Sequence, residues 1–306
     1  MRPGRAIAMK VMSVAMFVVM ASLIKAVSEH VPPGEAVFFR SLFAFPPIFI
    51  WLAFRGELAT GLRTSNPLGH LIRGVVGVTA MGLMFASLGL LPLPEVTAIG
   101  YATPLFVVIF AAVLLKERVR LFRLTAVGFG LIGVLIVLSP RLSGLSTIAA
   151  DDTAALGALF VIGASVFAAL AQVQVRRLVA FESTSSIVFW FSVTSTLLAL
   201  LTFPFGWVVP DVREMAFLIC AGLLGGIGQL CLTMAYRNGP AGLVAPFDYS
   251  SMLWALLIGF FIFGEVPTPT MLSGAALVIA AGVLIIWRER QLGLVRGRAK
   301  RNIPPV

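Results

Sequence analysis

The sequence predicts an all-α integral membrane protein, with ten transmembrane helices arranged as two inverted five-helix repeats. Two properties point to the membrane: 59% of the residues are hydrophobic and only 12% are charged, and the mean hydropathy is +1.01. Such a composition lies far outside that of a soluble globular domain. A third observation, the return of the segment at 95–119 as a degenerate copy at 242–267, indicates that one unit occurs twice.

The ten spans follow from the apolar runs, because a helix needs roughly 20 apolar residues to cross a hydrocarbon core about 30 Å thick. The runs are continuous rather than alternating, which favours helices over barrel strands, and a helix satisfies its own backbone hydrogen bonds in lipid. We expect the spans near 7–27, 36–54, 71–91, 95–115, 121–139, 154–176, 186–205, 215–236, 242–263 and 270–287.

The repeat also predicts how the two halves are oriented. Aligning Glu117 with Glu265 places Tyr101 on Tyr249 and Phe106 on Trp254, an aromatic on an aromatic in each case. Five spans precede the longest polar stretch and five follow it, and an odd number of spans per unit turns the second unit upside down, as in secondary transporters. We expect a first unit at 7–139, a linker at 140–153, a second unit at 154–287 and a basic tail at 288–306.

The basic residues predict the topology of the chain in the membrane. With the N-terminus placed in the cytoplasm, all but four of the 23 lysines and arginines fall on the cytoplasmic side, the exceptions being Lys25, Arg40, Arg141 and Arg213. This bias predicts cytoplasmic termini in a bacterial-type inner membrane. The net charge of +10 therefore indicates contact with anionic lipid, chiefly through the tail, rather than with nucleic acid.

Prolines and glycines predict where the helices bend and cross. Pro46 and Pro47 should bend the second span, and Pro246 should loosen the ninth beside Asp248, because proline removes a backbone donor. Gly222 and Gly226 have the spacing of a close helix crossing. The glycines of the third span, Gly74, Gly77 and Gly82, suggest a second close contact.

Ionisable groups inside a span are costly, so each of them is a candidate functional residue. Asp248 has two interpretations: it binds a solute group or the driving proton, or it pairs with Arg237, Arg73 or a neighbouring helix. Arg40 either neutralises a solute carboxylate at the outer mouth, locks Glu35 or Glu95, or snorkels to the headgroups.

For the other charged positions we expect structural roles. Lys25, His70 and Arg73 lie near predicted span ends and are expected to anchor them at the membrane surface. Glu117 and Glu265 are expected to cap the start of the helix that follows each of them.

The two tyrosines of the repeat are the main aromatic candidates. Tyr101 and Tyr249 lie at comparable depth in opposite copies, so both are expected near the middle of the membrane, where their rings and hydroxyls would orient a solute. Trp254 and Gln229 are further candidates for the solute or proton pathway, with packing or interhelical hydrogen bonding as the alternative for each.

Enzyme signatures are absent from the sequence. None of the four lysines is followed by Ser or Thr, so there is no Walker A loop to bind ATP. Two distant histidines, and two cysteines eleven residues apart on one expected helix, predict no metal site, no disulfide and no cofactor. An intramembrane enzyme is therefore disfavoured, whereas a channel or facilitative pore stays open as an alternative to a carrier.

The residues also carry a family resemblance over roughly Met9 to Trp287. The motifs GEAVFFR, HLIRG, ATPLF and APFDY, the last followed by FIFGEVP, resemble the drug/metabolite transporter superfamily with two EamA-type domains. The branch in question contains S-adenosylmethionine carriers and vitamin and metabolite carriers. The resemblance implies secondary-active transport of a small organic solute, by proton coupling or exchange, in a monomer or homodimer; riboflavin, S-adenosylmethionine and amino-acid-like metabolites are the candidate solutes.

Overall fold

The computed structural model describes residues 3–58, 61–114, 121–142, 152–179, 181–238 and 245–281, together with 283, 284 and 287. Every regular element in these ranges is a helix. The ends of the fourth expected span, with Glu117, and of the tenth, most of the predicted linker and the basic tail lie outside the described residues.

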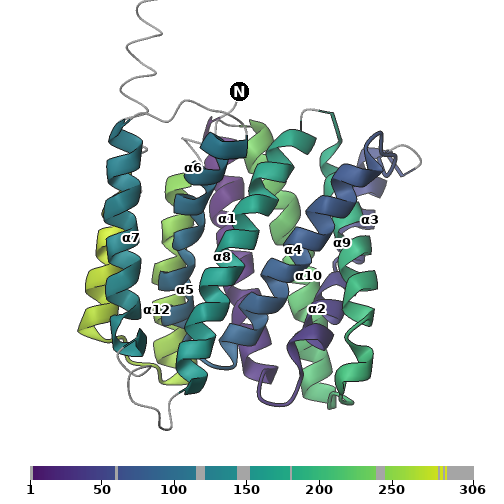
Figure 1. The fold of residues 1–306 in the computed structure, drawn as a ribbon. Coiled ribbons are helices and arrows are strands. Elements are labelled where there is room, and N and C mark those ends of the chain that lie inside the picture. The colour runs from purple at the N-terminus through teal and green to yellow at the C-terminus, as the bar shows by residue number, and fades with distance from the viewer. Residues whose placement is uncertain are drawn as a thin grey trace, which may run out of the picture.

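The helices group into the ten expected spans (Figure 1). In chain order these are α1 (Pro3–Val27), α2 with α3 (Pro33–Leu42, Phe45–Arg55), α4 (Pro67–Leu88), α5 with α6 (Leu93–Gly100, Ala102–Leu114), α7 (Leu121–Leu142), α8 (Asp152–Leu178), α9 (Thr184–Leu200), α10 (Val212–Asn238), the 3-10 helix η3 with α12 (Ala245–Tyr249, Ser250–Phe263), and a last helix at Pro269–Ala281. A further 3-10 turn, η2 (Phe203–Phe205), follows α9. Five of the helices are long and apolar enough to cross a membrane unaided, those of the first, second, third, sixth and eighth spans.

Three of the spans are broken, two of them at predicted prolines. The second span breaks at Phe43–Ala44, and its second half starts at Phe45 with the two prolines in its first turn. The ninth begins as a 3-10 helix that contains Pro246 and becomes α-helical at Ser250. The fourth span breaks at Tyr101, which ends α5. Breaks in membrane helices are tolerated where protein surrounds them, and they often line binding sites.

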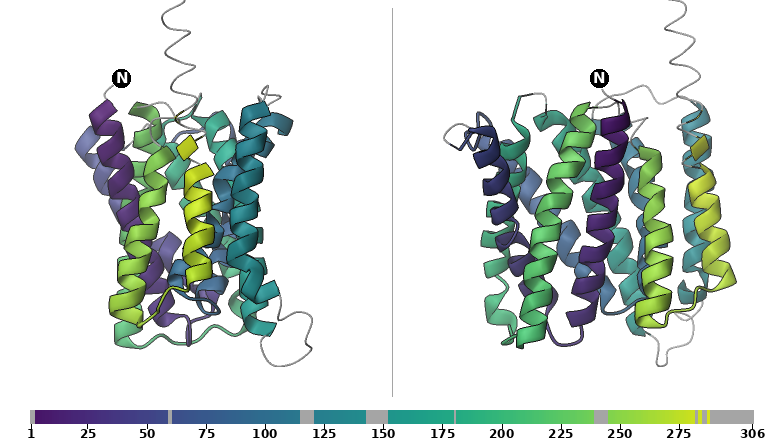
Figure 2. Two further views of the ribbon diagram at one scale, coloured as in Figure 1. Left: turned by 90° about the vertical axis from the view of Figure 1, so that its left-hand side faces the viewer. Right: turned by 180° about the vertical axis from the view of Figure 1, so that it is seen from behind.

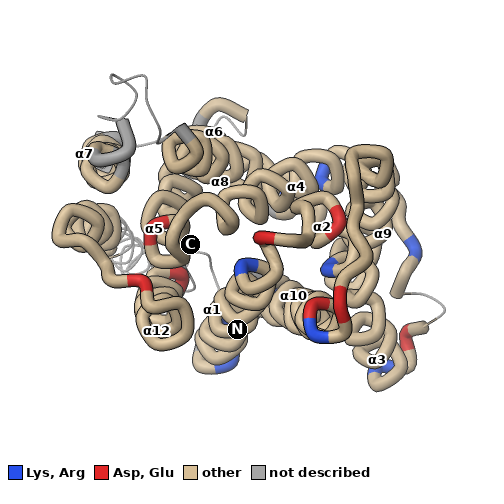
Figure 3. The backbone as a smooth tube through the Cα atoms, turned by 90° about the horizontal axis from the view of Figure 1, so that it is seen from below, with Lys and Arg blue, Asp and Glu red and all other residues tan. Residues whose placement is uncertain are grey.

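The packing of the helices repeats between the two halves. α1 packs along α10, and α8 packs along α4 in the same way, so the first span meets the eighth as the sixth meets the third. α2 packs on α9, and α5 packs on α12, which are contacts between equivalent spans. Seen along the helix axes, these pairs surround a common centre (Figure 3). The contacts are thus symmetric under exchange of the halves, as a duplicated unit requires.

The two halves run in opposite directions, as predicted. The fourth span rises towards the face on which α1 begins, whereas its counterpart α12 descends from that face (Figure 2). The last helix rises again, so it ends towards the face where the chain starts. We call this side the N-terminal face and the other side the opposite face.

Glycines set the closest crossings. A side-chain carbon at Gly226 would lie 2.9 Å from the carbonyl oxygen of Ala44, and one at Gly222 would overlap Phe43, so the predicted close crossing of α10 is confirmed. Gly133 of α7 and Gly274 of the last helix face each other in the same way. The prediction for Gly82 was wrong, because a side-chain carbon there meets nothing within 4 Å.

Candidate functional site

The two repeat-related tyrosines meet where their spans break. Tyr101 ends α5, and Tyr249 precedes α12. Their rings lie edge to face, with centroids 5.2 Å apart. The Tyr101 hydroxyl donates to the Tyr249 carbonyl at 3.2 Å and lies 2.9 Å from the Ser251 hydroxyl, which itself donates to the Asp248 carbonyl at 2.7 Å. Backbone oxygens near the start of the ninth span are thus bonded by side chains of both halves.

Asp248 forms an ion pair next to this contact. Its carboxylate lies 2.5 Å from the Lys10 ammonium of α1. The Lys10 side chain is only 3% exposed, whereas the Asp248 side chain is 37% exposed. The carboxylate is therefore open to exchange its partner, while the lysine is enclosed by protein.

The prediction that Asp248 pairs with a neighbouring helix is confirmed, because Lys10 belongs to α1, whereas the two named partners, Arg237 and Arg73, were wrong. Arg237 donates to the backbone carbonyl of Glu182 at 3.0 Å, and Arg73 lies over the ring of Phe191. Sequence reasoning counted Lys10 with the cytoplasmic charges and missed its role. Its position within the apolar run of the first span, rather than ahead of it, was the available signal.

Arg40 reaches the middle of the molecule rather than its outer mouth. Its guanidinium donates to Gly225, halfway along α10, over a long 3.4 Å, and lies 5.7 Å from the centroid of Phe191. The side chain is buried, so neither snorkelling nor a place at the mouth describes it. The expected lock with Glu35 is not formed, since that carboxylate accepts from the backbone N–H of Val208 at 3.0 Å.

Arg73 is likewise buried rather than anchored at the surface. Its guanidinium carbon lies 4.0 Å from the centroid of Phe191, the same ring that Arg40 approaches. The two arginines therefore come together from α2 and α4 on one phenylalanine of α9.

Lys25 and Glu265 form an internal cluster on the opposite face, which corrects the roles predicted for both. The Lys25 ammonium lies 3.0 Å from Glu265 and donates to the carbonyls of Leu88 and Leu91 at 3.1 and 2.7 Å. Glu265 also accepts from the backbone N–H of Leu93 at 2.9 Å. The carboxylate is indeed a helix cap, but it caps α5 of the other half and not the helix that follows it.

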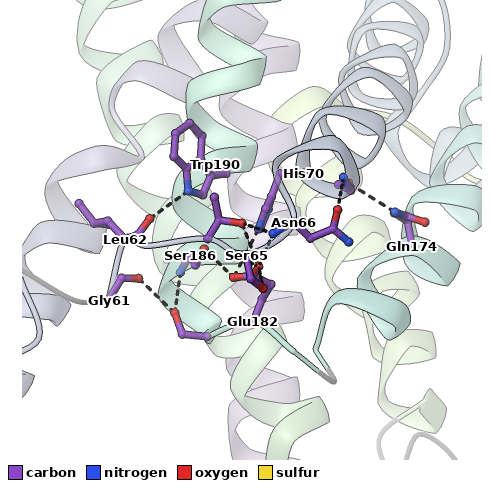
Figure 4. Close-up of polar contacts among 12 residues, drawn as sticks. Gly61, Leu62, Ser65, Asn66, His70, Gln174, Glu182, Ser186 and Trp190 are labelled. Atoms are coloured by element: carbon purple, nitrogen blue, oxygen red, sulfur yellow. Dashed lines mark hydrogen bonds and ion pairs between the residues drawn. The ribbon is translucent and has the colours of Figure 1, made fainter.

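His70 belongs to a polar network towards the N-terminal face, not to a membrane anchor (Figure 4). At its centre, Glu182 accepts hydrogen bonds from Thr64 and from the backbone N–H groups of Ser65 and Asn66, at 2.8–3.1 Å. His70 Nε2 lies 3.7 Å from the same carboxylate. Burial alone would raise the pKa of Glu182, but the hydrogen bonds and His70 hold it at about 2, below its ordinary 4.5. The network fixes the loop between α3 and α4 onto the start of α9.

Trp254 and Gln229 stay predictions. Trp254 is 39% exposed and follows the Tyr249 break by little more than one helical turn. Gln229 is partly buried on α10, beside Gly228, whose neighbours are Met16 and Phe17 of α1. The structure thus brings Tyr101, Tyr249 and Asp248 together, with Lys10 added to them.

The described residues offer ion pairs and buried charges rather than a metal centre. They include no group of three His, Cys, Asp or Glu side chains able to hold a metal ion. The Lys10–Asp248 pair joins two spans at a helix break, an arrangement typical of solute sites in transporters.

Comparison with known proteins decides the family. The sequence profile of the EamA-like transporter family matches residues 4–139 and again 155–287. The chain belongs to the EamA-like transporter family. It is therefore a multi-pass membrane transporter and not an enzyme, and the two matches agree with the duplicated halves of the fold.

Relatives of this EamA protein support the assignment. The pseudopaline exporter CntI of Pseudomonas aeruginosa is 31% identical over 273 residues, covering 88% of this chain and 91% of the exporter. An S-adenosylmethionine uptake transporter of Rickettsia bellii is 27% identical over 257 residues, covering 84% of each chain. A solved crystal structure superposes with a TM-score of 0.69 at 21% identity, covering 94% of this chain and 98% of its own, and it shares the fold.

Proposed function

We propose that this EamA protein is a secondary-active transporter that moves a small organic solute across a bacterial-type inner membrane by alternating access. The units at 7–139 and 154–287 are the halves that move, and both termini lie in the cytoplasm. The observation that carries the proposal is the meeting of the broken fourth and ninth spans at Tyr101 and Tyr249, beside the Lys10–Asp248 ion pair. Discontinuous helices that meet at the interface of inverted repeats form the solute sites of many transporters.

The ion pair supports coupled transport. Lys10 is enclosed by protein, so weakening its ion pair with Asp248 costs more than it would at an exposed site. A proton, or the cationic group of a solute, competes with Lys10 for the Asp248 carboxylate. The Lys10–Asp248 pair can therefore re-form only when the proton or solute leaves. The conformation of the site thus depends on whether a proton or solute is bound.

The relatives narrow the solute class. One is named an exporter of pseudopaline and another an importer of S-adenosylmethionine, so direction differs among proteins similar to this one. We propose an amino-acid-like metabolite as the solute, ahead of a vitamin such as riboflavin. The edge-to-face tyrosines offer a ring surface to its apolar part, and Asp248 offers a partner to its amine.

The test combines ligand screening with transport. Thermal-shift measurements on the purified protein against a metabolite panel identify a solute, because a ligand that binds the folded state raises its apparent stability. The solute is then followed into proteoliposomes, with and without an imposed pH gradient. We expect saturable flux; unitary currents in a planar bilayer would instead identify a channel.

Asp248→Asn tests the site directly. The asparagine amide keeps the shape of the side chain and one hydrogen bond to Lys10, but it carries no charge and cannot take up or release a proton. We expect the folded variant to lose gradient-driven accumulation. Asp211→Asn is the matched control, because Asp211 caps the exposed start of α10 and asparagine caps a helix equally well. Wild-type accumulation by Asp248→Asn would refute the role of this carboxylate.

A further inference from the structure

Arg40 and Arg73 share one feature that the transport site above does not use. Both residues are buried, with Arg40 3% and Arg73 6% exposed. Neither guanidinium forms an ion pair with any residue that the structure describes. Arg40 Nε and Arg73 Nε and Nη1 are buried without a hydrogen-bond partner. Arginine stays protonated in proteins, so both positive charges persist.

Their shared ring does not compensate for this. A desolvated guanidinium over an aromatic face gains less free energy than an unpaired buried charge costs. Phe191 serves both arginines, at 5.7 and 4.0 Å, which brings two like charges close together. The described residues supply no anion that would neutralise these two charges.

The backbone around the arginines leaves room for the two guanidiniums. A side-chain carbon at Gly77 would lie 2.0 Å from Arg73 Nη1, and one at Gly225 would lie 2.8 Å from Arg40 Nε. These two glycines occupy equivalent positions of the repeat, 148 residues apart like the two tyrosines. Alanine at either position would push the guanidinium out of its place.

Further unpartnered donors lie on the same helices. The hydroxyls of Ser41, Ser192 and Ser195 are buried without a hydrogen-bond partner, next to Arg40 in sequence or on α9 beside Phe191. By contrast, Thr194 and Thr196 of α9 donate to the carbonyls four residues before them. Since α2, α4 and α9 pack on one another, the two arginines and the three serines bring hydrogen-bond donors from three neighbouring helices.

We propose, resting on the transport function above, that Arg40 and Arg73 form the subsite that holds the carboxylate of the transported solute. The planar fork of a guanidinium matches a carboxylate through two hydrogen bonds, and the serine hydroxyls supply further donors. Arg40 contacts Gly225, which lies halfway along α10, so the subsite is near the middle of the membrane. An amino-acid-like solute would place its carboxylate here and its amine towards Asp248.

The test uses acetate as the smallest carboxylate and acetamide as its neutral isostere. The melting temperature (Tm) of the purified full-length protein is measured in sodium acetate and in sodium chloride at equal ionic strength. A third sample contains sodium chloride with acetamide. We expect acetate alone to raise Tm, by on the order of 3 °C at tenfold excess over its Kd. No acetate-specific rise up to about 0.1 M would overturn the proposal.

Substitutions locate the effect. Arg40→Met and Arg73→Met should each abolish the acetate shift while leaving the Tm of the ligand-free protein unchanged or higher, because each removes an unpaired buried charge. The control is Arg213→Met, which removes an exposed guanidinium from over Phe217 and should keep the acetate shift. An acetate shift that survives in the Arg40 and Arg73 variants would overturn the proposal. So would a fall of more than about 5 °C in their ligand-free Tm, which would make the arginines structural.

Transport distinguishes this proposal from the function on which it rests. Intact acetate binding without saturable flux would count against the transport mechanism alone. Saturable flux of a carboxylate-bearing solute by the double variant Arg40→Met, Arg73→Met would count against the subsite alone.

Discussion

The Lys25–Glu265 cluster should hold the opposite face of the transporter closed. It joins the end of the first span to the end of the ninth, and through the carbonyls of Leu88 and Leu91 and the N–H of Leu93 it also joins the third and fourth. A face on which four span ends share one ion pair cannot open without breaking it. We therefore expect Glu265→Gln, Lys25→Met and the double variant to favour the open state.

The expected magnitude follows from the burial of the pair. Exposed ion pairs contribute at most about 1 kcal/mol, and breaking a buried one costs about 3–5 kcal/mol. Each side chain of this pair is 15% exposed, so we expect an intermediate value of about 2 kcal/mol. That energy changes the ratio of closed to open molecules about 30-fold.

Electron paramagnetic resonance distances between two spin labels report this ratio. Glu29, just after the first span, and Thr268, just before the last helix, are exposed and accept labels as cysteines, once Cys220 and Cys231 are replaced. We expect one short distance in the otherwise unmodified protein, and a longer second population in Glu265→Gln.

The double variant separates a direct interaction from two independent effects. If Lys25 and Glu265 act on each other, the double variant should open little further than either single variant, because the second substitution removes an interaction already lost. Additive effects, or an unchanged distance in Glu265→Gln, would refute the idea that this pair closes the face.

Three further outcomes follow from the packing and the polar network. Gly133→Ala should destabilise the protein by about 1–3 kcal/mol, because its new carbon would lie 2.8 Å from the carbonyl oxygen of Gly274. The control is Gly128→Ala on the same helix, whose new carbon meets nothing within 4 Å and which should be neutral or stabilising. Thermal unfolding in detergent measures both variants. Glu182 has a folded-state pKa of about 2, below its ordinary 4.5. Its contribution to folding stability, up to about 3 kcal/mol, is therefore present above pH 4.5 and lost as the pH falls through about 2. Glu182→Gln should lower the stability at pH 7 and weaken its dependence on acid pH. Tyr101→Phe should cost about 1–3 kcal/mol in the same unfolding assay, since the hydroxyl's contacts with the Tyr249 carbonyl and the Ser251 hydroxyl are both lost.

Hydropathy and turn residues predict the spans because they act locally. Continuous apolar runs place all ten spans, and Pro46, Pro47 and Pro246 place two of the three breaks. The break at Tyr101 has a comparable proline, Pro104, in the first turn of α6, but we made no prediction from it. The break also shows in the repeat, because its partner Tyr249 follows Pro246 by three residues.

The partners of the charged side chains depend on which spans are neighbours and how each is rotated, which no local pattern contains. Lys25 and Arg73 lie near span ends, so snorkelling was the natural expectation for both. In the structure, Lys25 meets the carboxylate of a span far along the chain, and Arg73 turns inward to Phe191. Asp248 shows the same limit: its choice of Lys10 follows from the packing of α1 beside η3, a contact between the two halves.

The repeat finally explains where specificity should lie. The scaffold residues are matched between the halves: Gly77 with Gly225, Tyr101 with Tyr249, and Phe43 with Phe191. The charged residues of the proposed solute site are unmatched, since Asp248 corresponds to Gly100 in the first copy. A symmetric scaffold lets the two halves exchange roles during alternating access, but a solute with different ends needs an asymmetric lining. Substitutions at unmatched charges should therefore change what is carried, whereas substitutions at matched glycines should change whether the halves pack at all.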